Sequence, residues 1–234
     1  MSIKQKIYRV FPGIPRMNLR IGIGLYAQRL KRNKKNVIAD LAGKNNFYAN
    51  VGCGDAGFQD WVNVDYTAYH NVTHAFDCRK ELPFANHTVK GLFCEHFFEH
   101  IDYHTEVPYF LADCYRSLQK GGTLRIIVPD GEKYLRGYCS PGWDVLKKTR
   151  PLDDNLVDQL MGIQYETKMQ LVNEVFRQSG EHKFAWDFET MKVVMEKAGF
   201  SNINKMEYSK SHDPQLAIDQ LVREPESLYV DAIK

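Results

Sequence analysis

The sequence predicts an α/β fold in which helices cover both faces of a mostly parallel sheet. Short apolar runs of strand length alternate along the chain with longer segments of helical periodicity, as in a doubly wound sheet. A glycine turn at 52–57 directly follows the apolar run Phe47–Val51, and glycine allows close backbone approach to a ligand. The next apolar run, 61–64, leads into Asp65, a carboxylate placed to bind the two hydroxyls of a ribose.

Bulk properties indicate a cytoplasmic globular protein with one main domain. The 234 residues carry a net charge of +2 and are 44% hydrophobic, which is ordinary for a chain with a substantial core. The five cysteines include no C-x-x-C pair, which indicates reduced thiols rather than a disulfide framework or a cysteine zinc site. No apolar run approaches the roughly 18 residues of a membrane span, and we recognise no signal peptide.

Residues 1–44 differ in charge from the rest and are expected to form a separate basic arm. They hold eleven Lys and Arg residues against one acid, Asp40, whereas residues 45–234 are net acidic. A helix is predicted at 18–31. The asymmetry indicates an anionic partner: an anionic carrier, a membrane surface or, less favoured, nucleic acid. The alternative is a basic helix packed on the acidic body, and the oligomeric state is left open.

The later elements follow from periodicity and from their end signals. The clearest helix is 106–118, with six apolar side chains on one face, and Gly121-Gly122 is its stop signal. A second helix is capped by Asp187 and stops at Gly199. Residues 139–181, with a helical stretch at 155–178, interrupt the alternation and are interpreted as an insertion beside the site. Further strands are expected at 72–75, 89–94, 123–128, 203–208 and 228–233, the last two as an antiparallel edge hairpin.

The glycine turn spells G-x-G-x-x-G, yet its surroundings argue against a dinucleotide. Asp65 follows Gly52 by 13 residues, whereas the dinucleotide pattern places its acid about 20 residues on. The segment 55–61 has room for one helical turn at most, so no long helix N-terminus faces a pyrophosphate. These features favour a nucleoside ligand without phosphates, of which S-adenosylmethionine is the common one.

Six motifs in order resemble those of class I S-adenosylmethionine-dependent methyltransferases, and more narrowly the type-11-like proteins found among glycan and lipopolysaccharide biosynthesis functions. The resemblance covers 45–234 and implies a seven-stranded sheet of order 3-2-1-4-5-7-6 with strand 7 antiparallel. The motifs are NVGCG (50–54), NVD (63–65), FDCRKELPF (76–84), EHFFEH (95–100), LQKGGTLRIIVPD (118–130) and EKAGF (196–200).

Carried over by position, the resemblance implies a set of cofactor-binding residues. Asp65 holds the ribose hydroxyls, and Asp77 accepts from the exocyclic amine of adenine. The acid of the first motif is Asn50 here, so the carboxylate that pairs with the cofactor's ammonium group is missing. The complete set is Asn50, Gly52, Cys53, Gly54, Asp65, Asp77, Cys78 and Glu95.

A histidine cluster follows the middle strand. His96, Glu99 and His100 stand at i, i+3 and i+4, and the carboxyl end of such a strand is where open α/β sheets bind ligands. The spelling H-x-x-E-H also occurs in inverzincin proteases, but there it belongs on a long helix. Asp130 ends the fifth strand at the same edge and is expected to touch the acceptor.

The same stretch resembles a metal motif of other methyltransferases. Those acting on small-RNA 3′ ends, and some quinone-pathway O-methyltransferases, carry E-x-x-E-H here and bind a divalent metal. The small-RNA enzymes add a histidine in a segment similar to 182–186. The implied ligands are His96 (in place of Glu), Glu99, His100 and His182, a nitrogen-rich set that favours Zn²⁺, Mn²⁺ or Fe²⁺ over Mg²⁺. Alternatively, His96 or His100 acts as a general base without metal, or Glu99 and His100 are only structural.

These observations predict an O-methyltransferase that acts on a sugar hydroxyl of a glycan or of a lipid- or nucleotide-linked saccharide. A sugar hydroxyl is a poor nucleophile at neutral pH, so metal coordination or a base near it serves the chemistry. Two alternatives stand beside this interpretation. The basic arm and the segment around His182 point to an RNA 2′-O-methyltransferase. The other alternative is a non-catalytic subunit with a degenerate cofactor fold that binds a partner through its N-terminal arm.

Overall fold

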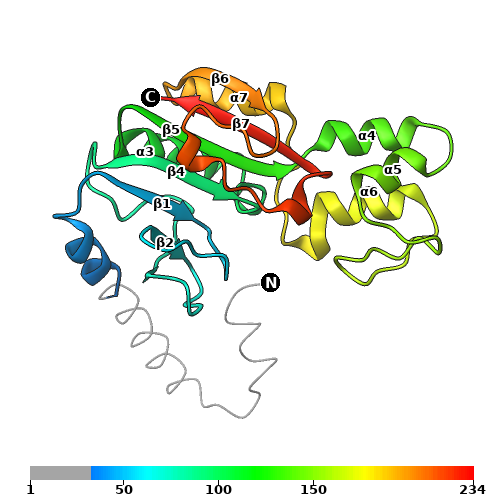
Figure 1. Ribbon diagram of the computed structural model, residues 1–234, viewed down its shortest axis with the longest axis horizontal. Coiled ribbons are helices and arrows are strands. Elements are labelled where there is room, and N and C mark those ends of the chain that lie inside the picture. Colours follow the sequence, from blue (N-terminus) through cyan, green and yellow to red (C-terminus); the bar gives the residue numbers. More distant parts are fainter. Residues whose placement is uncertain (1–32) are drawn as a thin grey trace, which may run out of the picture.

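The computed structural model describes residues 33–234. Its centre is a seven-stranded sheet in the order β3-β2-β1-β4-β5-β7-β6 (Figure 1). The first five strands in this order, from β3 at the edge to β5, are parallel to one another. Strand β7 is antiparallel to both of its neighbours, β5 and β6. This order confirms the predicted fold, including the closing hairpin. The strands are β1 Phe47–Val51, β2 Val62–Asp65, β3 His74–Ala75, β4 Val89–Glu95, β5 Leu118–Pro129, β6 Ser201–Met206 and β7 Ser227–Ile233.

Helices and short 3₁₀ turns connect the strands. The predicted helix at 106–118 is present as α3, and Asp187 caps α7 as expected by accepting from the backbone N–H of Thr190. Residues 33–41 are helical, whereas the helix predicted at 18–31 lies outside the described residues. The helices are α3 Val107–Ser117, α4 Gly131–Cys139, α5 Asp144–Thr149, α6 Lys168–Arg177 and α7 Phe188–Lys197; the 3₁₀ turns are η1 Phe98–His100, η2 Gln178–Gly180, η3 Pro214–Leu216 and η4 Leu221–Arg223.

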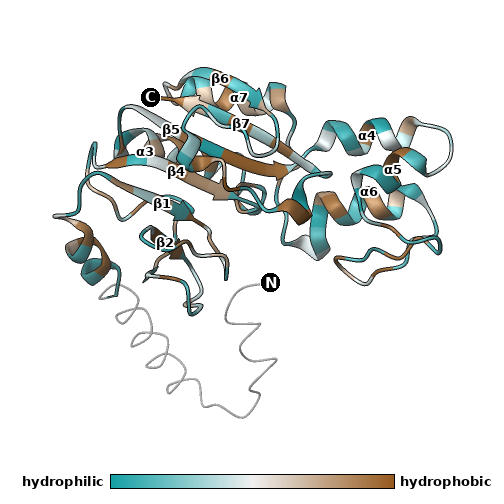
Figure 2. Ribbon diagram, in the orientation of Figure 1, coloured by the Kyte–Doolittle hydropathy of each residue, from teal (hydrophilic) through white to brown (hydrophobic). Residues whose placement is uncertain are grey.

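The sheet packs differently on its two faces because successive strand residues point to opposite sides. Leu92 and Cys94 of β4 face the main core, which receives the apolar stripes of α3 and α7, whereas Phe93 between them joins a smaller cluster on the other face. Figure 2 shows hydrophobic residues concentrated along the central strands. Alternate residues of β4 therefore contact either the main core or the smaller cluster.

The segment between β6 and β7 is anchored to the smaller face by a buried charge network. Arg125 of β5 donates to both carboxylate oxygens of Asp219, at 2.8 and 2.6 Å, and to Asp231 Oδ1 at 2.7 Å. All three side chains are fully buried. This segment, which carries η3 and η4, is thereby held beside the carboxyl end of β4.

Helices α4, α5 and α6 form a lobe beyond the carboxyl end of β5 (Figure 1). They share an apolar core of their own, made by Tyr134, Leu146, Tyr165, Leu171, Val172 and Val175. The predicted helical stretch at 155–178 is only partly present, because α6 begins at Lys168, where Thr167 forms a capping box with Gln170. The preceding residues are irregular: buried Asp158 accepts from Arg150 and from two backbone N–H groups, which opposes a helix.

No helix among residues 33–234 is long and apolar enough to cross a membrane.

Candidate active site

A cavity of about 430 Å³ opens at the carboxyl ends of β1, β2 and β3, where the sequence places the cofactor. Four of the predicted cofactor residues line it: Gly52, Asp65, Asp77 and Cys78. The other lining residues were not assigned to the cofactor from the sequence, although His100 was predicted as a catalytic or metal-binding residue; they are Tyr66, Phe76, Arg79, Phe97, His100, Glu181 and Lys183.

The glycine loop holds Asp65 in place. Gly52 and Gly54 have φ of 69° and 53°, a left-handed conformation that glycine adopts without strain. The turned loop lets Gly54 N–H donate to Asp65 Oδ2 at 2.9 Å, and Thr67 N–H donates to Oδ1 at 2.8 Å. Each carboxylate oxygen keeps a further lone pair. Asp65 is thus oriented by the backbone and can accept from a ribose that lies in the cavity.

A bidentate ion pair also lines this cavity. Arg79 donates to Asp77 Oδ1 at 2.8 Å and to Oδ2 at 2.6 Å. These hydrogen bonds lower the pKa of Asp77 in spite of partial burial. Asp77 is therefore ionised at neutral pH, as the expected acceptance from an adenine amine requires.

Other residues assigned to the cofactor lie outside the cavity lining. Asn50 donates to the carbonyl of Ala56 at 3.0 Å and so braces the glycine turn, while Cys53 is buried beneath it. Glu95 lies on the same face of β4 as Phe93 and accepts from the backbone and side-chain N–H groups of Gln220 at 3.0 and 2.9 Å. Glu95 does not line this cavity, and its expected contact with the cofactor stays a prediction.

Replacement of Gly52 by Ala is expected to impair the cofactor loop. The added Cβ meets the ring of Phe97 at 2.3 Å, and the positive φ strains any L-residue. Overpacking and backbone strain together cost about 2–5 kcal/mol. Calorimetry with S-adenosylhomocysteine is expected to show at least about tenfold weaker binding. Gly54→Ala is the matched control, because its φ is also positive but no atom lies within 4 Å of its Cβ. Equal affinity of both variants contradicts the assignment of Phe97 to the cofactor wall.

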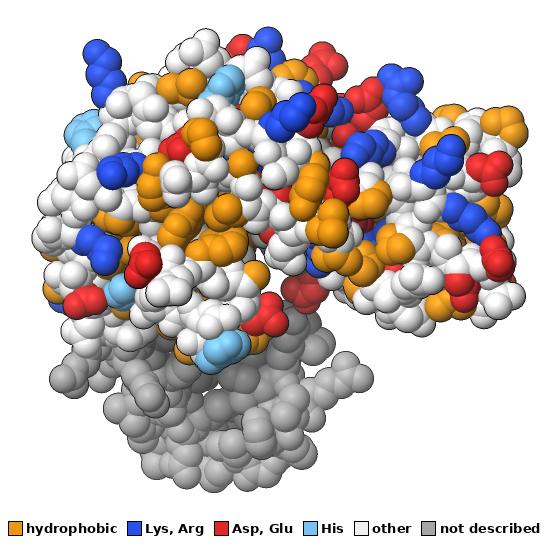
Figure 3. All heavy atoms as spheres, viewed as in Figure 1, with side chains coloured by type: hydrophobic (Ala, Val, Ile, Leu, Met, Phe, Trp, Pro, Cys, Tyr) orange, Lys and Arg blue, Asp and Glu red, His pale blue; other side chains and the backbone are white. Residues whose placement is uncertain are grey.

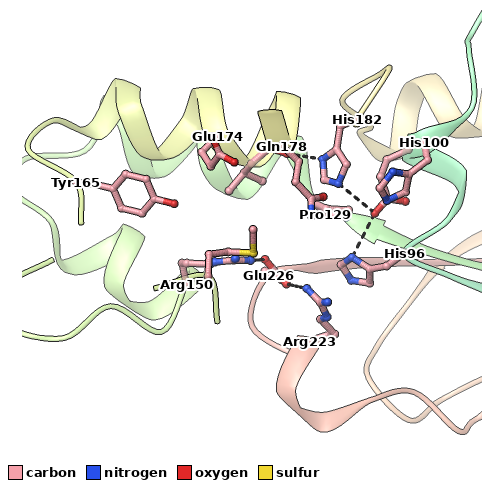
Figure 4. A pocket seen from close by; sticks show the side chains of 13 residues that line it. His96, His100, Pro129, Arg150, Tyr165, Glu174, Gln178, His182, Arg223 and Glu226 are labelled. Atoms are coloured by element: carbon pink, nitrogen blue, oxygen red, sulfur yellow. Dashed lines mark hydrogen bonds and ion pairs between the residues drawn. The ribbon is translucent and has the colours of Figure 1, made fainter. Parts of the chain in front are cut away.

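A second cavity, of about 100 Å³, lies between η1, the lobe and the segment before β7. Its lining residues are His96, Glu99, His100, Pro129, Arg150, Met161, Tyr165, Glu174, Val175, Gln178, His182, Arg223 and Glu226. Figure 4 shows the three histidines at one end and Tyr165 at the other. His100 belongs to the walls of both cavities. The two cavities therefore adjoin at this imidazole.

Three predicted metal ligands meet at that border. Potential ligand atoms of Glu99, His100 and His182 all lie within 4.8 Å of one another. Glu99 and His100 come from η1, directly after β4, and the N–H of Lys183 donates to the carbonyl of Glu99 at 2.7 Å, which ties the His182 segment to η1. The chain reaches this position through a left-handed turn after α6, with φ of 37° at Gln178 and 54° at Ser179.

The environment of these three side chains fits a metal ion. Glu99 is 2% exposed, and neither of its carboxylate oxygens accepts a hydrogen bond of good geometry from residues 33–234. A buried carboxylate of this kind calls for a cation or another polar partner. Burial would raise the pKa of Glu99, but His96, His100 and His182 together lower it, so the group is ionised.

His182 is prepared for coordination by its own hydrogen bond. Its Nδ1 lies 2.6 Å from the carbonyl oxygen of Val175 and so carries the proton. The lone pair is then on Nε2, which lies 3.9 Å from Glu99 Oε1. Burial lowers the pKa of His182, which keeps the imidazole neutral. A backbone carbonyl that accepts from the other ring nitrogen is the usual companion of a metal-binding histidine.

Two predicted site residues have other surroundings. His96 lines the second cavity but lies outside the cluster of three, with Nε2 3.0 Å from Ser227 Oγ and Nδ1 3.3 Å from Glu99 Oε1. Asp130 is fully buried, caps α4 through Glu132 N–H at 3.0 Å and accepts from Lys205 at 3.1 Å. It lines neither cavity, because its carboxylate serves the helix N-terminus.

The comparisons with known proteins agree with this fold. Residues 21–126 match a family model described as a methyltransferase domain. A SAM-dependent methyltransferase from Archaeoglobus fulgidus is 17% identical with a TM-score of 0.50, covering 91% of this chain and 99% of that one. A SAM-dependent methyltransferase from Thermotoga maritima, titled a possible histamine N-methyltransferase, is 15% identical with a TM-score of 0.50, covering 97% and 99%. No curated protein is a match.

Sheet order and structural likeness define the class I methyltransferase fold. With the match to a methyltransferase domain, they make the chain a methyltransferase that uses S-adenosylmethionine. The cavity beside Asp65 is where that cofactor is expected. The alternative of a non-catalytic subunit has no support in these findings.

Proposed function

We propose that the protein transfers the methyl group of S-adenosylmethionine to a hydroxyl of a saccharide, assisted by a divalent metal on Glu99, His100 and His182. One observation carries the proposal: these side chains stand where the cofactor cavity adjoins the second cavity. Methyl transfer is an in-line displacement, so donor and acceptor must approach each other across a shared border. His100 lies at that border, and the second cavity is the acceptor site.

The three ligands leave coordination positions open, as catalytic metal sites do. When bound, a divalent metal would coordinate the acceptor hydroxyl, lower its pKa and orient its oxygen. Two imidazoles and one carboxylate favour Zn²⁺, Mn²⁺ or Fe²⁺ over Mg²⁺. If no metal binds, His100 is the imidazole placed to take the hydroxyl proton as a general base.

The lining of the acceptor cavity supports a polyhydroxyl substrate. Glu174 of α6 and Gln178, which follows the last residue of that helix, point into it from one side (Figure 4). Opposite them, Arg150 and Arg223 share the carboxylate of Glu226. Hydroxyl groups both donate and accept hydrogen bonds, so they match this mixture of carboxylate, amide and guanidinium groups.

Chelation and reconstitution test the metal. The protein is treated with EDTA and supplied with Zn²⁺, Mn²⁺, Fe²⁺ or Mg²⁺, and methyl transfer to a panel of glycans and lipid- and nucleotide-linked saccharides is followed by mass spectrometry. We expect methylated product that is lost on chelation and restored by one of the first three ions. His182→Ala is expected to lower the rate by about 10²–10⁴-fold, whereas exposed His104→Ala is the control. Full activity after chelation would contradict the proposed role of a metal. Absence of product from every saccharide would contradict the proposal that the acceptor is a saccharide.

An RNA 2′-hydroxyl is the second candidate acceptor. It is favoured by one observation: Glu99, His100 and His182, the ligands implied by the resemblance to small-RNA methyltransferases, do come together. On the face shown in Figure 3, however, basic and acidic side chains of the described residues are interspersed. The basic arm lies largely outside the described residues, and its docking to an anionic carrier or membrane stays a proposal. RNA binding with steep salt dependence would support this second candidate. Absence of affinity for RNA at low salt would contradict it.

A further inference from the structure

A chain of three side chains, of which the first and last are buried, runs from β7 to the proposed metal cluster. Ser227 Oγ lies 3.0 Å from His96 Nε2, and His96 Nδ1 lies 3.3 Å from Glu99 Oε1. Ser227 and Glu99 are 1% and 2% exposed. Ser227 starts β7 and Glu99 lies in η1, so these contacts join elements that are distant in sequence.

The backbone at His96 adopts an unusual conformation. Its φ is 51°, in the left-handed region, which a non-glycine residue keeps only where the surroundings impose it. The N–H of His96 donates to the carbonyl of Ile127 at 2.8 Å, which holds the turn. The surroundings therefore fix the backbone that carries this side chain between Ser227 and Glu99.

The three residue types are those of a serine nucleophile with its base, but burial excludes that role. The hydroxyl of Ser227 is enclosed and lines neither cavity. Its contact with Nε2 leaves Nδ1 as the ring nitrogen of His96 that faces the carboxylate of Glu99. An imidazole that accepts from the Ser227 O–H at Nε2 carries an N–H donor on Nδ1.

We propose that His96 is a positioning residue, oriented by Ser227, which turns the carboxylate of Glu99 toward His100 and His182. This inference rests on the proposed function, because it concerns the metal ligand Glu99. It departs from the sequence interpretation, in which His96 is itself a ligand or the base. Outer partners of this kind typically contribute 10–100-fold in metal affinity.

Cobalt binding tests the proposal in the full-length protein without cofactor or acceptor. Co²⁺ affinity and the Co²⁺ absorption spectrum are measured for the wild type, His96→Ala, His96→Asn and Ser227→Ala. We expect about 10–100-fold weaker binding for His96→Ala, a smaller loss for Ser227→Ala, and partial rescue in His96→Asn, whose amide retains a donor near the Nδ1 position. The spectrum of the bound ion is expected to stay unchanged, since no ligand is removed.

Ser117→Ala is the matched control, because Ser117 is another buried serine, whose hydroxyl donates to the carbonyl of Asp113 at 2.7 Å in α3. It is expected to leave cobalt affinity unchanged. If His96 were a ligand, His96→Ala would alter the spectrum, and Ser227→Ala, by freeing Nε2, would not weaken binding; either result overturns the proposal. If His96→Ala does not fold, the cobalt affinity of Ser227→Ala decides whether the proposal holds. Tight wild-type binding with all variants unaffected overturns this inference alone, whereas no wild-type binding overturns the proposed metal site as well.

Discussion

Replacement of Glu99 by Gln is expected to lower methyl transfer by about 10³-fold while the fold is retained. The substitution removes the anionic ligand, and the charge stabilisation that a metal supplies is worth several kcal/mol. Because the Glu99 carboxylate is buried without good hydrogen bonds from the described residues, a neutral amide costs the metal-free protein little. The melting temperature without metal is therefore expected to stay the same or to rise. Residues retained for function often lower stability, so that their replacement does not destabilise the fold.

Asp158→Asn is the contrasting control for this prediction. Asp158 is equally buried, but it accepts from Arg150 and from the backbone N–H groups of Leu160 and Met161. Neutralising it leaves Arg150 with a weakened partner, and breaking a buried ion pair typically costs 3–5 kcal/mol. Asp158→Asn is thus expected to lower the melting temperature by several degrees. A Glu99→Gln protein with wild-type turnover contradicts the proposed site.

Replacement of Asp65 by Ala is expected to weaken S-adenosylmethionine binding by about 10²-fold. The carboxylate is expected to accept from the ribose, and hydrogen bonds to a charged group contribute about 1.5–3 kcal/mol each. The same change removes the acceptor for Gly54 N–H and Thr67 N–H, so the loop also loses its brace. Titration calorimetry with the cofactor and with S-adenosylhomocysteine measures the effect.

Asp55→Ala is the control for this second experiment. Asp55 is an exposed acid of the same loop that does not line the cofactor cavity, so its removal is expected to leave affinity within about twofold. Unchanged affinity in Asp65→Ala would mean that the cofactor binds elsewhere on the sheet. Equal losses in both variants would indicate a general effect of negative charge rather than a contact with the ribose.

Much of the fold could be predicted from local patterns. The strand order was implied by the resemblance to class I methyltransferases, whereas α3 and the cap at Asp187 were expected because apolar periodicity and capping depend on residues that are close in sequence. The helix expected from residue 155 begins at Lys168, since the preceding residues are organised around buried Asp158 rather than by their own propensity. Residues of the lobe that line the acceptor cavity carried no recognisable sequence signal.

The sequence by itself determined the cofactor end of this protein: a glycine turn and Asp65 lie within one short segment, so their chemistry is readable from spacing alone. The grouping of His182 with Glu99 and His100 was implied by a resemblance, but only the tertiary structure decided how these side chains meet. It brings His182 to them through the left-handed turn at Gln178 and Ser179, and it turns His96 toward Ser227. The physical reason is that such contacts depend on strained backbone angles and long-range packing, neither of which a linear pattern specifies.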